Sequence, residues 1–458
     1  MGECMYSDLK YLEVPLPEDV QKLKWHGDFT ALDECIAHKL QKDIPLALRK
    51  RLELEREIVR RIPQQYPYSK EKAIALLKDT FKDFAESEFR RLWLENAVEW
   101  IYRDGTVYLH KLFIDNLVKT RPEFAARCIH PENFDDPAAN FALLNTAIED
   151  IKKEGHLTYY FRIKSTLEVT APSVAASDAL CVHIPVPVEY AQVKNFKLLG
   201  TSAKPDCIAA PDYPQRTVCF TSRAAECKTF SVEYEFENHI AYTELEAEKV
   251  SDAQPTFYTE EQAPHIRFTP YIKMLASEII GKETNPLIKA RKIYDYITTH
   301  VMYSFVRSYI TIDAISEYVA SGLKGDCGIQ ALLFITLCRY AGIPARWQAG
   351  LYATPLRVGN HDWAQFYIAP YGWLFADCSF GGSAYRHKDM NRWNYYFGNI
   401  DPYRIPLASD FQHEFALSAG NLRNDPYDNQ TGEAAVNGKN LFGDEFEAKA
   451  EAVAIQKR

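Results

Sequence analysis

The chain has 458 residues, of which 47% are hydrophobic, and a formal net charge of −9. This length exceeds that of one compact domain, and the composition excludes a disordered chain. The acidic balance excludes a chain-wide attraction to nucleic acid or anionic membranes, and no apolar segment reaches the roughly 20 residues that span a bilayer. We therefore expect a multidomain globular protein with no nucleic-acid partner and no membrane span.

The ten cysteines are scattered along the chain. They include no C-x-x-C pair and no Cys/His spacing typical of a zinc ribbon, so we expect no structural zinc. Scattered cysteines in a chain of this length are typical of reduced thiols, which favours a cytoplasmic location. The first residues, MGECMYSDLK, lack the basic start and apolar segment of a secretory signal. The alternative is a secreted or periplasmic location, which would follow if a signal segment precedes these residues in the full protein.

Residues 1–155 are predicted to form a helical domain. From residue 28 to about 155 the pattern is helical; Ile74, Leu77, Phe81 and Phe84, for example, recur at helical spacing with charged residues between them. We interpret the charged faces as solvated surfaces of a packing domain and not as basic binding patches.

Residues 156–246 are predicted to form a β-sandwich, because the hydrophobic period changes from Leu157 onward. Phe161, Ile163 and Val169 share one parity, and the segments 182–188 and 230–236 alternate in the same way. Residues 247–268 are polar, contain proline and show no period, which indicates a linker.

The third domain is predicted over residues 269–400. Helices are expected at about 270–280 and 286–302, and strands at 343–353, 361–368 and 373–378. Between them, Asp326 is a good N-cap residue and Gly342 with Pro344 gives a stop signal, so a helix is predicted from Cys327 to Ala341. Residues 401–458 are predicted to be an extension that wraps the surface.

Cys327 is the first residue of that predicted helix. The unpaired N–H groups and the positive end of the helix dipole favour a thiolate there, and the same groups can hold an oxyanion. Asp326 would raise the thiol pKa if its charge faced the sulfur, so we expect its side chain to cap the helix instead.

Two further residues suit a nucleophile of this kind, since His361 opens one predicted strand and Asp377 closes the next. They are equidistant from Ala369, so a hairpin turning near 369 and 370 would set them directly opposite on one face. A two-residue turn at 371 and 372 would separate them. Together with Cys327 they form a pattern of nucleophile, base and orienting carboxylate.

Simpler interpretations exist for each residue alone. Cys327 could be a small buried hydrophobic residue, His361 a hydrogen-bonded surface residue and Asp377 a turn acid. Asp362 could compete with Asp377 for the orienting role. A metal site built from Cys327, His361 and Asp377 would have one thiolate and no closely spaced ligand pair, so we expect no metal there.

The segments GDCGIQALLFITLCRYAGIPARWQAG, HDW and WLFADCSF resemble the transglutaminase-like superfamily, a branch of the papain-like cysteine enzymes. The resemblance implies a multidomain α+β protein of bacterial type, whose core is an antiparallel sheet packed on a central helix. It implies Cys327 as nucleophile, His361 as general acid/base and Asp377 as orienting carboxylate. Asp362, between the His and the Trp, departs from the commonest pattern of the family, and the second oxyanion donor is not identified.

The segment KARKIYDYITTHVMYS is similar to the helix-to-tyrosine entry of bacterial members, which implies that Tyr303 lines the site. We also place Asp326, Gly328 and Trp363, which lie beside the motif residues, in the wall or substrate-binding part of the site. The resemblance covers about residues 270–382 specifically and the preceding β-domain more loosely.

The expected function is cysteine-dependent acyl transfer on peptide or protein amides through a thioester, with no cofactor. Water as acceptor gives a peptidase or amidase, which the family analogy favours, and a lysine amine gives a transglutaminase. The alternative from a different class is a non-enzymatic scaffold built on the same core. The sequence does not define the substrate or the oligomeric state.

Overall fold

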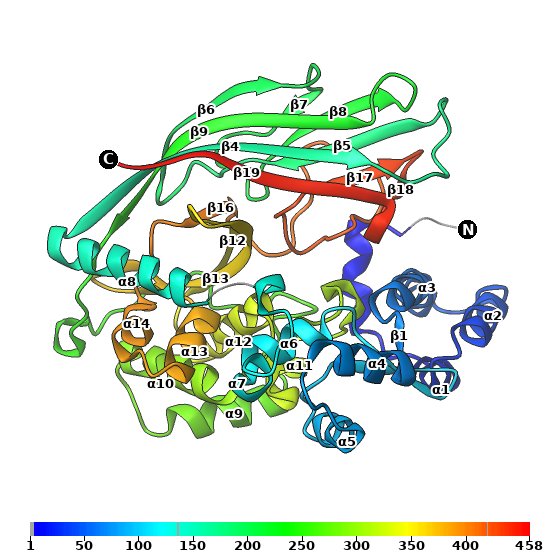
Figure 1. Ribbon diagram of the computed structural model, residues 1–458, viewed down its shortest axis with the longest axis horizontal. Helices are drawn as coiled ribbons and strands as arrows, with labels where there is room; N and C mark the ends of the chain where they lie inside the picture. Colours follow the sequence, from blue (N-terminus) through cyan, green and yellow to red (C-terminus); the bar gives the residue numbers. More distant parts are fainter. Residues whose placement is uncertain (1–3, 135–136, 419) are drawn as a thin grey trace.

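The computed structural model describes residues 4–134, 137–418 and 420–458. Two β-sheets form a sandwich along one side of the molecule, and a layer of helices with a third large sheet lies beneath it (Figure 1). The N-terminal helices, blue in Figure 1, pack beside this lower layer. No helix among the described residues combines the length and apolarity that a membrane crossing requires.

The N-terminal third is mainly helical, as expected, but it also contains a small sheet. Its strands pair in the order β1-β3-β2 and are β1 (Tyr68–Ser69), β2 (Trp100–Arg103) and β3 (Thr106–Leu109). Asp104 and Gly105 both have positive φ and join β2 to β3 in a two-residue hairpin turn. The prediction of continuous helices was therefore wrong here; the D-G turn between alternating apolar residues was the available signal. The helices are η1 (Tyr6–Glu13), α1 (Glu18–His26), α2 (Phe29–Leu40), α3 (Leu46–Gln65), α4 (Lys70–Thr80), α5 (Glu86–Leu94), α6 (Phe113–Thr120), α7 (Pro122–Ala125), η2 (Pro131–Asn133) and α8 (Pro137–Glu154).

The sandwich has one sheet in the order β18-β17-β5-β8-β7 and another in the order β19-β4-β9-β6. The strands are β4 (His156–Val169), β5 (Ala179–Pro185), β6 (Val193–Thr201), β7 (Cys207–Ile208), β8 (Thr217–Arg223), β9 (Thr229–Ala241), β17 (Glu433–Val436), β18 (Lys439–Asn440) and β19 (Phe446–Lys457). Alternate apolar side chains such as Phe161, Val182 and Phe236 meet between the sheets and form the core.

The C-terminal residues are part of this sandwich, which corrects the prediction that 401–458 form a surface extension. β19 pairs with β4 along nearly its whole length, and β17 pairs with β5. In Figure 1 the red strand β19 lies directly beside β4. The inward residues of β19 include Ala448, Ala450 and Ala452, whose small side chains give a weak hydrophobic pattern in sequence.

The remaining part is an α+β core built around one helix, as expected. α12 (Cys327–Tyr340) is buried from Gly328 to Arg339, which is typical of a central helix surrounded by other elements. A five-stranded antiparallel sheet packs on it in the order β15-β14-β13-β12-β16. Its strands are β12 (Ala345–Ala353), β13 (Val358–Ile368), β14 (Gly372–Ala376), β15 (Phe397–Gly398) and β16 (Arg404–Ala408).

The other elements of this core surround α12 and the sheet. They are η3 (Ala247–Lys249), α9 (Pro270–Ile280), α10 (Pro286–His300), β10 (Met302–Tyr303), η4 (Tyr309–Thr311), α11 (Ile315–Gly322), β11 (Lys324–Gly325), α13 (Cys378–Arg386) and α14 (Met390–Tyr395). The remaining short helix, η5 (Gly443–Glu445), belongs to the sandwich, where it precedes β19. β10 pairs in parallel with β11, which places Tyr303 opposite Gly325, just before the cysteine.

Candidate active site

Cys327 begins α12, as predicted, and Asp326 caps the helix. Asp326 Oδ1 accepts the backbone N–H of Ile329 at 3.2 Å and the hydroxyl of Tyr309 at 2.6 Å. Burial raises the pKa of Asp326 to about 6 in spite of these two donors. Tyr309 was not predicted, because it begins the short helix η4, 17 residues before Asp326 and outside the motif residues.

The Cys327 sulfur donates a hydrogen bond to Asp362 Oδ2 at 3.3 Å. Burial raises the thiol pKa well above its usual value, and the charges of Asp362 and Asp326 raise it further. The prediction of a lowered pKa was therefore wrong for this state of the protein, because desolvation and two carboxyl groups outweigh the helix N-terminus. Within the described residues, the hydrogen bonds of this sulfur do not include one to His361.

His361 and Asp377 form a close pair, with His361 Nε2 2.8 Å from Asp377 Oδ2. The hairpin pairs Ile368 with Gly372 and Ala364 with Ala376, so the predicted register, centred on 369, is two residues out. The connection contains three residues, 369–371, which places Asp377 opposite 363 and diagonal to His361. A shift of two residues keeps the side chains on one face, so they still meet.

Asp377 is held by more than the imidazole. It caps α13 by accepting the N–H of Phe380 at 3.0 Å, and it accepts a bond from Arg404 Nη2 at 3.0 Å. Burial raises the pKa of Asp377, but the charges of His361 and Arg404 outweigh it and bring the pKa to about 2. Burial lowers the pKa of His361 against the opposing effect of Asp377. Asp377 is thus a permanent acceptor that fixes Nε2 and leaves Nδ1 for a reacting group.

The sulfur and the imidazole approach β13 from opposite faces. Asp362 faces α12, as does Phe366, whose ring contacts Phe334 on that helix. His361 is adjacent in the strand and therefore points to the other face. β14 pairs with β13 only from Ala364 onward, so the edge of β13 beside His361 and Asp362 is not covered by that strand. The predicted catalytic residues therefore gather at one buried part of the strand edge, beyond the end of β14, without a Cys327–His361 contact.

Buried carboxyl groups surround this edge. Burial and the charge of Asp428 raise the pKa of Asp362 well above its usual value. Burial and Asp425 raise the pKa of Asp428 to about 8. Gln430 donates through Nε2 to Asp362 Oδ1. These groups come from the segment before β17, 68 residues beyond Asp362 in the case of Gln430, so local spacing could not have revealed them.

The structure gives the predicted wall residues different surroundings. Tyr303 is half-buried; burial raises its pKa, and the electrostatic effect of Cys327 raises it further. A Cβ on Gly328 would clash with the Tyr309 hydroxyl and lie 2.8 Å from Asp362 Oδ2, so this close approach requires glycine. Trp363 is fully buried and lies beside the His361 ring, with 5.9 Å between centroids, so it supports the ring and does not line an open surface.

Comparison with known proteins supports the assignment of the core. Residues 273–378 match the family model described as the transglutaminase-like superfamily, so this part of the chain is a transglutaminase-like domain. Over 272 residues the chain is 24% identical to an uncharacterized protein of Haemophilus influenzae, covering 52% of this chain and 73% of that protein.

Two solved structures are also similar to the chain. One is a candidate cysteine protease from Cytophaga hutchinsonii, with 17% identity, a TM-score of 0.42, and coverage of 65% of this chain and 91% of that one. The other is the periplasmic domain of TgpA from Pseudomonas aeruginosa, with 14% identity, a TM-score of 0.29, and coverage of 54% and 95%.

Proposed function

We propose that the protein is a cysteine-dependent enzyme that hydrolyses amide bonds of peptides or proteins through a thioester. The observation that carries this proposal is the buried His361–Asp377 pair, 2.8 Å apart, at the strand edge that Cys327 of the transglutaminase-like domain also reaches. A buried imidazole fixed by a permanently ionised carboxylate is the usual requirement of a general acid/base next to a nucleophile.

In the proposed reaction, the Cys327 thiol gives its proton to His361 Nδ1 and the sulfur attacks the amide carbonyl carbon. The N–H groups at the start of α12 stabilise the oxygen that becomes negative. His361 then returns the proton to the departing amine, and the C–N bond breaks to leave a thioester. Water, deprotonated by the same ring, attacks the thioester and releases the carboxylic acid and the free thiol.

The contact between Cys327 and Asp362 represents a resting state in this proposal. A protonated thiol bound to a carboxyl group is a weak nucleophile. Reaction requires the sulfur to leave Asp362 and face the imidazole around the part of the β13 edge that β14 does not pair with. Asp362 therefore restrains the nucleophile, and His361 activates it.

The experiment is mass spectrometry of peptide libraries incubated with the wild type and with Cys327→Ala, with and without an added amine. We expect chain cleavage by the wild type and none by Cys327→Ala. Cys35→Ala, in the N-terminal helices, is the matched control and should cleave normally. Incorporation of the amine would mean that the protein is a transglutaminase and not a hydrolase. Identical peptide products from the wild type and Cys327→Ala would contradict the proposal.

A further inference from the structure

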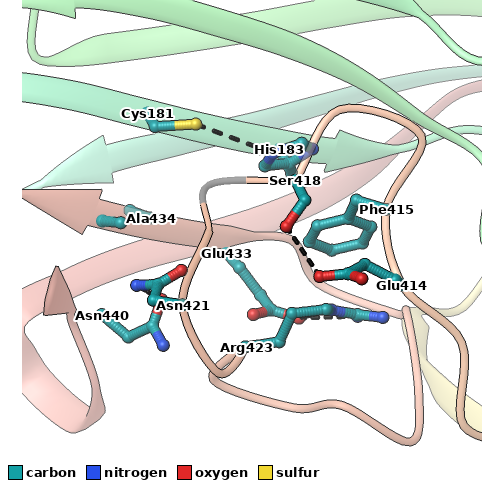
Figure 2. Close-up of a pocket in the computed structure, with 11 residues that line it drawn as sticks. Cys181, His183, Glu414, Phe415, Ser418, Asn421, Arg423, Glu433, Ala434 and Asn440 are labelled. Atoms are coloured by element: carbon teal, nitrogen blue, oxygen red, sulfur yellow. Dashed lines mark hydrogen bonds and ion pairs between the residues drawn. The ribbon is translucent and has the colours of Figure 1, made fainter. Parts of the chain in front are cut away.

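A second cluster of reactive side chains lies in the sandwich, away from Cys327. Cys181 and His183 belong to β5, and Cys219 belongs to the neighbouring strand β8, where it pairs with His183. Their inward neighbours, such as Val182, fill the sandwich core, so the three side chains point to the outer face of the sheet. Figure 2 shows Cys181 and His183 directed toward each other beneath the loop that carries Phe415.

The three potential ligand atoms already have the spacing of a zinc site. Cys181 Sγ is 3.7 Å and Cys219 Sγ is 3.5 Å from His183 Nε2, and the sulfurs are 3.9 Å apart. Tetrahedral zinc, with Zn–S near 2.3 Å and Zn–N near 2.0 Å, places two sulfurs about 3.8 Å apart and a sulfur and a nitrogen about 3.5 Å apart. A disulfide would need sulfurs about 2.05 Å apart, so the geometry favours metal ligands.

The orientation of His183 is fixed independently of the sulfurs. Its Nδ1 lies 3.1 Å from the Thr217 hydroxyl, and the Phe415 ring stacks on it at 4.2 Å between centroids. Hydrogen bonding of one ring nitrogen to a neighbour leaves the other as the metal-binding atom, which is the common arrangement of zinc-bound histidine. His183 is buried, so this arrangement is part of the folded core and not a surface rotamer.

The structure also leaves room for a fourth ligand. A cavity of about 20 Å³, enough for one water, is bordered by Cys181, His183 and Phe415. Glu433, opposite His183 in β17, is held by Arg423 at 2.7 Å. The sulfur of Cys207, which pairs with Cys219 across β7, lies outside the group of ligand atoms that are within 4.8 Å of one another.

We infer that Cys181, His183 and Cys219 bind a zinc ion whose fourth ligand is water. The site joins β5 to β8 beneath the loop that carries Phe415, and it contributes no residue to the Cys327 site. Two thiolates and an imidazole are ligands that zinc accepts and that magnesium and calcium avoid. This inference replaces the expectation of no structural zinc, which rested on the absence of closely spaced cysteine pairs.

The test uses the full chain, stripped with a chelator under reducing conditions and then titrated with zinc against a chromogenic competitor. We expect one zinc per chain, a higher melting temperature with zinc, and sulfur-to-cobalt charge-transfer absorption when cobalt replaces zinc. Failure to bind one zinc per chain, or a Cys181–Cys219 disulfide in the unreduced protein, would overturn the inference.

Variants separate binding from folding. Cys181→Ser and Cys219→Ser should each weaken zinc binding by at least about 100-fold, and Thr217→Val, which leaves all ligands in place, by about 10-fold or more. Cys227→Ser, in the same sandwich, and Cys207→Ser should bind like the wild type. Equal binding by all variants would overturn the inference. Loss of binding in Cys207→Ser would show that Cys207, and not water, is the fourth ligand.

Discussion

At the scale of single residues, the protonation state of the Cys327 thiol is set by its surroundings and not by its position at the start of the helix. The helix N-terminus favours the thiolate, yet burial and two carboxyl groups keep the proton on the sulfur. Gly328 makes this arrangement possible, because any side chain there would meet Tyr309 and Asp362.

Gly328→Ala should therefore disturb the site directly. We expect activity to fall at least tenfold and the free energy of unfolding to drop by about 1–3 kcal/mol, because the neighbours must move to admit the methyl group. Urea unfolding and peptide cleavage measure the two effects. Gly322→Ala is the control, since a Cβ there meets nothing within 4 Å, and a similar loss in both variants would contradict the steric explanation.

Asp377→Asn tests the orienting role. The variant keeps the shape but loses the charge that binds His361 and Arg404, so kcat/KM should fall by about 10²–10⁴. Asp401→Asn removes another carboxylate from Arg404, 3.1 Å away, without touching His361. It should affect stability comparably and leave kcat/KM near the wild-type value. Equal activity losses in the two variants would show that Asp377 has only a structural role.

At the scale of elements, helix caps and strand parity could be predicted from local sequence, whereas register and partners could not. Asp326 and the stop signal at Gly342 defined α12 almost to the residue. The shared face of His361 and Asp377 was also correct, since it depends only on parity, but the turn shifted the register by two residues. The hydrogen bond from the Cys327 sulfur to Asp362 was not predicted, because Asp362 was considered only as an alternative to Asp377 for orienting the imidazole.

The cap of α12 can be tested separately from its charge. Asp326→Ala should lower the free energy of unfolding by about 1 kcal/mol, because the N–H of Ile329 loses its acceptor. Asp326→Asn should cost less, since asparagine caps nearly as well. Thermal unfolding compares the variants, and equal losses would mean that the charge, and not the cap, stabilises the helix.

At the scale of the whole molecule, the last 60 residues unite the sandwich with the candidate active site. β17 and β19 complete both sheets, and the segment before β17 supplies Asp428 and Gln430 to the site. Such long-range pairing leaves no local pattern, which is why the C-terminal region was misassigned. The zinc ligands were missed for the same reason, since Cys219 lies 36 residues beyond His183.

Asp428 should make stability depend on pH. Its folded pKa, raised to about 8, means that the folded state holds the proton more tightly than the unfolded state. Its stabilising contribution is thus complete below about pH 4 and is lost as the pH rises toward 8. Asp428→Asn should reduce the decline of unfolding free energy between pH 5 and 8 by on the order of 1–3 kcal/mol. Exposed Asp252→Asn is the control, and equal slopes in both variants would contradict this assignment.

The most direct test of the proposed nucleophile is the rate at which iodoacetamide alkylates Cys327 at neutral pH in the wild type, His361→Gln and Asp362→Asn. We expect His361→Gln to slow the reaction about tenfold or more, because the activating base is lost. Asp362→Asn should accelerate it, because the charge that raises the thiol pKa is removed. The opposite pattern, with His361→Gln unchanged and Asp362→Asn slower, would contradict the proposed roles and make Asp362 the base.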